Sequence, residues 1–323
     1  MNAEQARSLL RTMWRIRAFE ERVGRLKRSD EVHGLIHLST GGEGVAAAVC
    51  GQLRDGDVVY SGHRAHGHVI AKGAPLPETM AELMGRAGGL CRGMGGSMHL
   101  VDVAHGMLGA TGVVGGTVPA ALGSALAARM RRESTEGEDT VSVVFFGDGA
   151  VQAGTFAESV NIAALWRLPV VLVCENNGFA EFTPRSAHTP VERVSDLVAP
   201  WGITAATVDG NDAVAVWEEF ARLLAGVRAG DGPALLEALT HRLRGHYEGD
   251  PDRYRDAIAT EEWQQRDPVL RLERTGIAHG WFDTDEAKAV REAAHAEVED
   301  AVTWARESPW PTPELAASLV YGS

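Results

Sequence analysis

Two apolar runs, each ending abruptly in polar residues, constrain the fold of this 323-residue chain more than any other feature. Residues 140–146 are rich in valine and phenylalanine and end at Gly147, and residues 169–174 form a second run that ends at Glu175. Residues 152–166, between the two runs, carry apolar side chains at helical spacing. Continuous apolar strands that alternate with helices are typical of a parallel sheet covered on both faces. The sequence therefore predicts an α/β fold built on a parallel sheet.

The same alternation continues along the rest of the chain. Apolar residues spaced by three and four predict an amphipathic helix over residues 3–27, and helical spacing recurs over residues 285–306. We expect an N-terminal helix in residues 1–30, an α/β domain in residues 31–250 and a helical C-terminal extension in residues 251–323 that wraps the surface or a neighbouring subunit. The other expected elements are strands over residues 57–60, 203–208 and 234–239, and helices over residues 113–130 and 212–228.

The composition argues against several classes of function. With 31 Lys and Arg against 44 Asp and Glu, the net charge is −13, which disfavours nucleic acid as a partner. No apolar run approaches the ~20 residues of a membrane-spanning helix, and the first residues lack the apolar core of a signal peptide. The three cysteines are far apart and include no Cys-x-x-Cys pair, which is typical of reduced proteins. We therefore expect a cytoplasmic protein without a nucleic-acid or membrane partner.

Polar residues follow both apolar runs at the point where each predicted strand ends. Because ligands bind at the carboxyl ends of parallel strands, we expect these residues to form a site. Asp148 and Asn177 each offer an oxygen ligand and the Phe179 carbonyl offers a third, which suits a Mg²⁺ ion shared with a phosphate. Gly147 and Gly149 allow close backbone approach, and the next helix N-terminus presents free N–H groups to an anion. Gly-Asp-Gly alone is typical of a tight turn, but the paired asparagines after the second strand favour the metal site.

Several motifs together resemble one known family. The stretch from Gly147 to Asn177 resembles the thiamine diphosphate motif, and residues 5–305 as a whole resemble the alpha subunit of 2-oxo acid dehydrogenase first components. Within that family the pattern is most similar to the acetoin dehydrogenase and pyruvate dehydrogenase alpha subunits. The other segments that carry the resemblance are Gly-Met-Gly-Gly-Ser-Met-His at residues 93–99, Gly-Met-Leu-Gly-Ala at 106–110, Gly-Val-Val-Gly at 112–115, Leu-Pro-Val-Val at 168–171 and Gly-His-Tyr-Glu-Gly-Asp at 245–250.

The resemblance implies a thiamine diphosphate-binding α/β fold and a set of cofactor contacts. Asp148, Asn177 and the Phe179 carbonyl would hold Mg²⁺ bridging the diphosphate. Arg64 and Arg242 would pair with the phosphates, which suits the fork geometry of a guanidinium group. The remaining cofactor-binding residues that it implies are His63, Gly112, Val114, Gly147, Gly149, Ala150 and His246.

Two histidines match the active-site histidines of the family. His246 and His37 would assist substrate binding, proton transfer or acyl transfer, so the resemblance implies catalytic roles for both. His63, His66 and His68 also form a His-x-x-His-x-His pattern. That pattern is compatible with a metal site, but a structural role is the simpler interpretation, since the neighbouring magnesium motif needs oxygen ligands.

The resemblance also implies a partner chain. Thiamine diphosphate needs a carboxylate against its aminopyrimidine ring, and in this family a separate beta subunit supplies it. Glu43 lies in a Gly-Gly-Glu-Gly segment that resembles a structural part of the alpha chain, so we do not assign it this role. We expect an α2β2 heterotetramer that decarboxylates a 2-oxo acid or cleaves acetoin, and that passes the acyl group to a lipoyl-bearing acyltransferase. The alternatives are a carboligase of specialised metabolism and a cofactor-binding scaffold without turnover.

Some positions depart from the family pattern. Ala180 replaces a common glycine, and it is expected to be strained if φ is positive there. Residues 151–153 replace a usual small-Asn-Gln stretch, which leaves the substrate open. Tyr247 follows His246 where kinase-regulated relatives have serine, so we expect no phosphorylation at this point. Residues 244–255 are expected to form a mobile loop that the cofactor orders.

Overall fold

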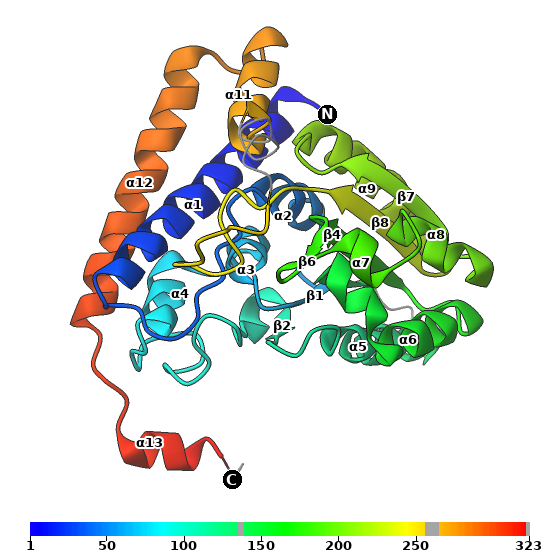
Figure 1. Ribbon diagram of the computed structural model, residues 1–323, viewed down its shortest axis with the longest axis horizontal. Coiled ribbons are helices and arrows are strands. Elements are labelled where there is room, and N and C mark those ends of the chain that lie inside the picture. Colours follow the sequence, from blue (N-terminus) through cyan, green and yellow to red (C-terminus); the bar gives the residue numbers. More distant parts are fainter. Residues whose placement is uncertain (135–138, 256–264, 321–323) are drawn as a thin grey trace.

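A parallel sheet is the centre of the fold (Figure 1). The computed structural model describes residues 1–134, 139–255 and 265–320. In these residues a six-stranded sheet has the order β2-β1-β3-β4-β8-β7, and each neighbouring pair is parallel. The strands are β1 (Val58–Ser61), β2 (Met107–Ala110), β3 (Ser142–Gly147), β4 (Val170–Asn176), β7 (Thr204–Asp209) and β8 (Ala234–Leu239), and a separate antiparallel pair is formed by β5 (Phe179–Ala180) and β6 (Thr183–Pro184).

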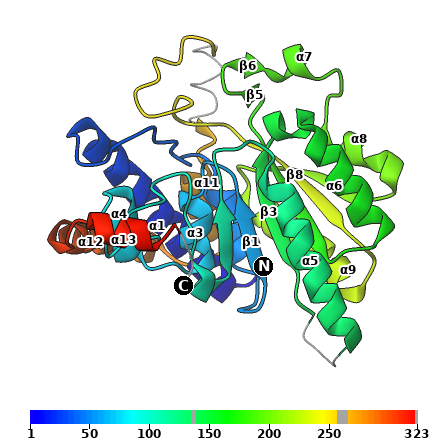
Figure 2. The ribbon, with the colours of Figure 1, turned by 90° about the horizontal axis from the view of Figure 1, so that it is seen from below.

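Helices cover both faces of this sheet (Figure 2). Alternate strand residues enter different cores: Val143 and Phe145 belong to the larger apolar cluster, whereas Val144 and Phe146 belong to the smaller one. The larger cluster contains side chains of α1 (Ala3–Arg28), α2 (Glu43–Cys50), α3 (His66–Lys72), α4 (Leu76–Leu83) and α9 (Ala213–Ala229), and the smaller contains those of α5 (Thr117–Ser134), α6 (Gly154–Leu165) and α8 (Val194–Val198). The predicted α/β class with a two-sided parallel sheet is confirmed.

The C-terminal helices pack on the N-terminal one. Helix α12 (Thr284–Glu307) runs beside α1 and α4, and its buried Val298, Ala301 and Val302 belong to the larger core. Helix α11 (Pro268–Ala278) also contacts α1, whereas α13 (Pro313–Ser318) buries none of its residues. The predicted helix over residues 285–306 therefore covers this chain itself. No described helix combines the length and apolar character needed to cross a membrane.

The remaining elements are short. They are α7 (Arg185–His188) and three 3-10 turns, η1 (Val103–His105), η2 (Asp148–Gln152) and η3 (Ala199–Trp201). The helix expected from residue 113 begins at Thr117, because residues 113–116 form a turn in which Gly115 has a positive φ of 80°. Strand β2 was not predicted. Part of the proposed C-terminal extension, residues 256–264 and 321–323, lies outside the described residues.

Candidate active site

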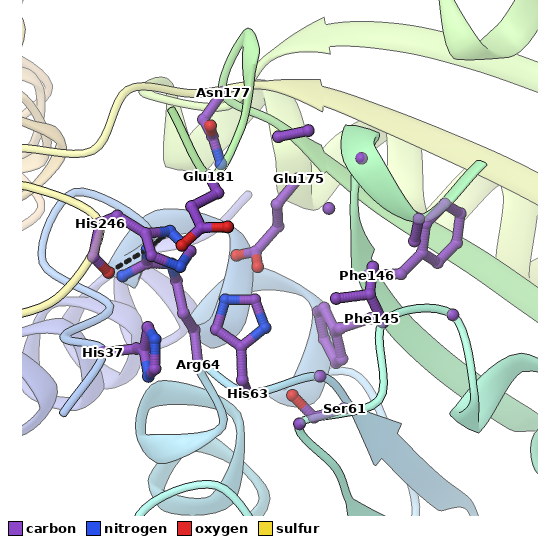
Figure 3. Close-up of a pocket in the computed structure, with 18 of the residues that line it drawn as sticks. His37, Ser61, His63, Arg64, Phe145, Phe146, Glu175, Asn177, Glu181 and His246 are labelled. Carbon is purple, nitrogen blue, oxygen red and sulfur yellow. Dashed lines mark hydrogen bonds between the residues drawn. The ribbon is translucent and has the colours of Figure 1, made fainter. Parts of the chain in front are cut away.

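A cavity of about 470 Å³ opens at the carboxyl ends of β3 and β4 (Figure 3). Its size is ordinary for a cofactor or substrate site. Segments far apart in sequence form its wall, including the end of β1 and the loops after β2, β3, β4 and β8. The predicted site residues that line it are His37, His63, Arg64, Gly112, Val114, Gly147, Gly149, Ala150, Asn177, Phe179, Arg242 and His246.

Asp148 lies directly behind this wall. It follows β3 as the first residue of η2 and is 1% exposed. Its Oδ1 accepts a 3.3 Å hydrogen bond from the Asn177 backbone N–H, so the ends of β3 and β4 are joined at this point. Burial raises the pKa of the Asp148 carboxyl. The backbone hydrogen bonds and nearby positive charges, which favour the ionised form, do not fully offset the loss of its hydration.

Two buried oxygens beside the cavity have no hydrogen-bond partner among the described residues. They are Oδ2 of Asp148 and Oδ1 of Asn177. The Nε2 atom of His188 is 4.0 Å from Oδ2, which is beyond hydrogen-bond distance. Buried polar atoms are rarely left unpaired, and carboxylate and amide oxygens are the ligands that a hard cation prefers. The pair therefore has the chemistry of a Mg²⁺ site, and the lining residue Phe179 is two positions further along the chain.

The two adjacent asparagines have different roles. Asn176 Nδ2 donates a 2.6 Å hydrogen bond to the buried Glu237 carboxylate on β8, and Asn176 Oδ1 accepts from the Gly178 backbone N–H. Glu237 also accepts from the N–H groups of Val194 and Ser195. Asn176 thus fastens the end of β4 to its neighbours, whereas the next residue, Asn177, lines the cavity.

The glycine after Asp148 permits a close approach. A Cβ atom at Gly149 would lie 2.8 Å from the Cβ of Ala180, so a side chain there would displace the β5 segment. The prediction of backbone strain at Ala180 is wrong, because φ is not positive at this residue. The residue with the left-handed conformation is the next one, Glu181, with φ of 55°. The reason is that Ala180 belongs to β5, and the chain reverses after it.

Three histidines form one wall of the cavity. The ring of His37 is 4.7 Å from that of His63 and 4.9 Å from that of His246, measured between centroids. Burial, and next the positive charge of Arg64, lowers their pKa values to about 4 for His37, about 2 for His63 and about 3 for His246. All three rings are therefore neutral near pH 7.

The arginines beside them fix one tautomer and disfavour a metal. Arg64 and Arg242 donate to Nδ1 of His246 at 3.3 and 2.9 Å, so the proton of this neutral ring is on Nε2. The three histidines are the one cluster of metal-ligand type among the described residues. Two guanidinium groups in contact with it oppose a cation, so we assign it no metal.

Arg64 and Arg242 are held by backbone and side-chain acceptors. Arg64 donates to the carbonyls of Leu38 and His246 at 2.7 and 2.6 Å, and Arg242 donates to the Glu181 carbonyl at 3.0 Å. Burial lowers the pKa of both, to about 9 for Arg64, which leaves both groups charged at pH 7. The cavity therefore contains two fixed positive charges that can pair with an anion.

The pattern of His63, His66 and His68 is not a metal site. His66 bonds Glu20 at 2.9 Å and Ser97 at 2.8 Å, and it is fully buried in this network. His68 bonds Ser61 through Nδ1 and stacks on Phe145 instead. The three rings are directed to different partners.

Glu43 is also structural. It is fully buried, and one of its oxygens accepts a 2.6 Å hydrogen bond from Arg17 Nε, which also binds Asp267 through Nη1 at 2.7 Å. Glu43 does not line the cavity. These contacts join α1, α2 and the start of α11.

One carboxylate shapes the glycine-rich segment beside the cavity. The buried Glu82 side chain accepts hydrogen bonds of 2.7 to 3.0 Å from four backbone N–H groups, those of Cys91, Gly93, Gly95 and Gly96. The segment continues into Ser97, which bonds His66, and Met98, which lines the cavity.

The segment over residues 244–255 forms internal contacts above the histidines. Asp250 accepts hydrogen bonds from the His246 backbone N–H at 2.6 Å and from the Tyr254 hydroxyl at 2.7 Å. Tyr254 in turn packs its ring 5.6 Å from that of Phe179. The ordering of this segment by a cofactor stays a prediction.

Several cavity residues were missed from the sequence. The most informative are two carboxylates, Glu175 and Glu181, which Figure 3 shows pointing into the space near His63. Glu175 directly follows the apolar run over residues 169–174, and its place at the end of a predicted strand was the signal that could have identified it as a site residue. Glu181 had no such signal. The others missed are Ser61, Gly62, His68, Met98, Gly115, Thr117, Phe145, Phe146 and Ala180.

Comparison with known proteins identifies the family of this chain. Residues 11–314 match the family described as "Dehydrogenase E1 component". The acetoin:2,6-dichlorophenolindophenol oxidoreductase alpha subunits of Bacillus subtilis (strain 168) and Cupriavidus necator are 39% and 40% identical, over 100% of this chain and 95% and 96% of their own lengths. The pyruvate dehydrogenase E1 component alpha subunit of Rhizobium meliloti is 38% identical over 93% of this chain and 85% of its own length.

Proposed function

Because this chain belongs to the dehydrogenase E1 component family, we propose that it is the alpha subunit of a thiamine diphosphate- and Mg²⁺-dependent oxidoreductase. Its substrate would be a 2-oxo acid or acetoin. The observation that carries the proposal is the pair of unpartnered buried oxygens of Asp148 and Asn177 at the edge of a cavity that two arginines line, Arg242 buried and Arg64 partly buried. A metal ion bound to a diphosphate satisfies both features at once.

The residues present fit such a group. Asp148, Asn177 and the Phe179 carbonyl would hold Mg²⁺, and Arg64 and Arg242 would pair with the phosphate oxygens, with His63 as a further donor. The backbone N–H groups of Gly149 and Ala150 are at the start of η2, where unpaired donors favour an anion. Gly112 and Val114 would contact the aminopyrimidine. The other proposed cofactor residues are Gly147 and His246.

The cofactor would supply a nucleophilic carbon and an electron sink when bound. This chain would contribute binding, orientation and hydrogen bonds. His246, with its proton on Nε2, would donate to a substrate oxygen, and its orientation is fixed by Arg64 and Arg242. His37, whose buried Nδ1 has no described partner, would be the second such group.

The chain would act with a partner. Val114, which lines the cavity, and its neighbour Val113 are 52% and 68% exposed, and this pair of exposed apolar side chains suits coverage by another protein. We propose a beta subunit in an α2β2 heterotetramer that supplies the carboxylate for the aminopyrimidine. The acyl product would pass to a lipoyl-bearing acyltransferase. The three cysteines are free, which supports a reducing compartment such as the cytoplasm.

Co-expression with a beta-type chain tests the proposal. The purified complex is expected to bind thiamine diphosphate in calorimetry only when Mg²⁺ is present, and to reduce 2,6-dichlorophenolindophenol with acetoin or pyruvate. The single substitution Asn177→Ala should abolish the Mg²⁺-dependent part of the binding. Unchanged affinity in this variant would remove the metal-site assignment, and dye reduction by the alpha chain alone would remove the need for a partner.

A further inference from the structure

Glu181 occupies an unusual position in the cavity wall. It lines the cavity, and its side chain points into the same space near His63 as that of Glu175 (Figure 3). The residue lies between β5 and β6, where Ala180 pairs with Thr183. Its backbone carbonyl accepts from Arg242, so the segment is tied to a second wall of the cavity.

The backbone at this position favours glycine. Glu181 is the first of the two residues that connect the paired strands, and it alone of the two has a positive φ, of 55°. Hairpins with this pattern usually have glycine there, because a Cβ atom is strained in the left-handed region. Backbone strain that persists in a cavity wall is typical of residues whose side chain is used.

Glu181 is exposed, and its carboxylate has no hydrogen bond or ion pair with any residue that the structure describes. The arginines nearby bond other groups. Arg242 bonds His246, Tyr254 and the Glu181 carbonyl, with only its Nε left without a described partner, and Arg64 bonds His246 and two backbone carbonyls. Under the proposed function both arginines would also face the diphosphate. The three histidines are neutral because burial lowers their pKa values, so they add no positive charge.

We propose that Glu181 selects the charge class of the substrate, favouring an uncharged hydroxyketone such as acetoin over a 2-oxo acid anion. This inference rests on the proposed function and deepens it. A carboxylate in the cavity wall repels a second carboxylate in the same cavity, whereas its oxygens accept a hydrogen bond from the hydroxyl of a hydroxyketone. Acetoin and pyruvate have the same number of non-hydrogen atoms and share an acetyl group, so their charge is the main difference.

The reactions of acetoin and pyruvate both balance with the same dye as the electron acceptor. Acetoin, water and oxidised dye give acetate, acetaldehyde and reduced dye: the bond between the carbonyl and carbinol carbons breaks, and the acetyl unit loses two electrons to the dye. Pyruvate, water and oxidised dye give acetate, carbon dioxide and reduced dye, with the bond to the carboxylate carbon broken instead. One dye assay therefore measures both substrates.

The test compares kcat/KM for acetoin and pyruvate in the assembled complex with 2,6-dichlorophenolindophenol. The wild type should prefer acetoin. Glu181→Gln, which keeps the size and removes the charge, should lower the acetoin-to-pyruvate ratio about tenfold, the order expected for one like-charge contact at the edge of a protein. Glu181→Gly, which also relieves the backbone, should shift the ratio in the same direction. Glu192→Gln removes an exposed charge outside the cavity and should leave the ratio unchanged.

An unchanged ratio in both Glu181 variants, or a wild type that prefers pyruvate, would overturn the selection by charge and leave the proposed function intact. A complex that binds no thiamine diphosphate in calorimetry and uses neither substrate would overturn both. A lower ratio in Glu192→Gln equal to that in Glu181→Gln would show a general effect of net charge, which also overturns the assignment to Glu181.

Discussion

The Asn176 amide donates to the Glu237 carboxylate across the boundary between β4 and β8, at 2.6 Å. Glu237 is completely buried, and the pKa of its carboxyl is lowered, against the effect of burial, by hydrogen bonds from Val194, Ser195 and Asn176. Because this bond uses Asn176 inside the fold, only the next asparagine is available to the cavity. The pair therefore divides into a structural residue and a binding residue.

Exchanging each asparagine should separate stability from binding. Asn176→Ala removes a donor from a buried carboxylate and should lower the free energy of unfolding by roughly 1–3 kcal/mol. Asn177→Ala removes an oxygen that has no described partner, so its stability should change little while Mg²⁺-dependent cofactor binding is lost. Urea denaturation and calorimetry measure the two effects. Equal destabilisation by both substitutions would contradict the division.

Asp148→Asn should preserve the stability of the cofactor-free protein and remove the stabilisation by the cofactor. Burial raises the pKa of this carboxyl, so the ionised form destabilises the folded protein at neutral pH and protonation at lower pH relieves that cost. The amide should therefore leave the melting temperature of the cofactor-free complex equal or higher. The stabilisation by Mg²⁺ and thiamine diphosphate, about 2.7 kcal/mol at a hundredfold excess over Kd, should disappear. Asp196→Asn, on the surface, is the matched control.

Arg17→Met should be among the most destabilising single substitutions. It leaves the buried Glu43 and Asp267 carboxylates without their shared cation, and the loss of one partner from such a network costs roughly 3–5 kcal/mol. Arg15→Met, on the same helix as Arg17, breaks a partly exposed ion pair with Glu297 of α12 and should cost less than about 1 kcal/mol. Urea denaturation of both variants checks the difference, and similar midpoints would contradict it.

His37→Gln should reduce the loss of stability in acid. In the folded protein burial, together with Arg64 and Arg242, lowers the pKa of His37 to about 4, whereas the unfolded chain has an ordinary value near 6.5. The unfolded chain therefore takes up a proton that the folded one does not, and stability is lost as pH falls from 6.5 to about 4. At pH 5 the effect should be roughly 1–2 kcal/mol.

Melting temperatures measured between pH 7 and pH 5 test this difference. The wild type should lose more stability over this range than His37→Gln does. His33→Gln, at an exposed position, should behave like the wild type. A slope in His37→Gln as steep as that of the wild type would show that His37 is not responsible.

The sequence was sufficient to predict the residues that end the two central strands. Asp148 and Asn177 follow apolar runs directly, and the geometry of a parallel sheet brings such positions together without knowledge of the loops. Strand β2 was not predicted because its four residues include a glycine and lie at the sheet edge, where little apolar patterning is required. The family identification was confirmed by the match over residues 11–314.

The positions that could not be predicted depend on tertiary contacts. The strain was expected at Ala180 and lies at Glu181, since the pairing of β5 with β6 decides which residue begins the reversal. The neutral state of His37 likewise depends on burial and on Arg64, which is distant in sequence. Local patterns identify the chemistry of a side chain, but its protonation and direction are set by neighbours that the fold supplies.

The cavity lies where the two apolar cores meet. Residues of α5 and η2 belong to the smaller core, whereas the segments that carry His37 and Arg64 lie against the larger one. No contiguous piece of the chain contains both walls, because they are supplied by residues from position 37 to position 246. A chain arrested with one core formed would have no site for the ligand. A ligand bound at this site would therefore stabilise both cores together, because the site exists only in the folded chain.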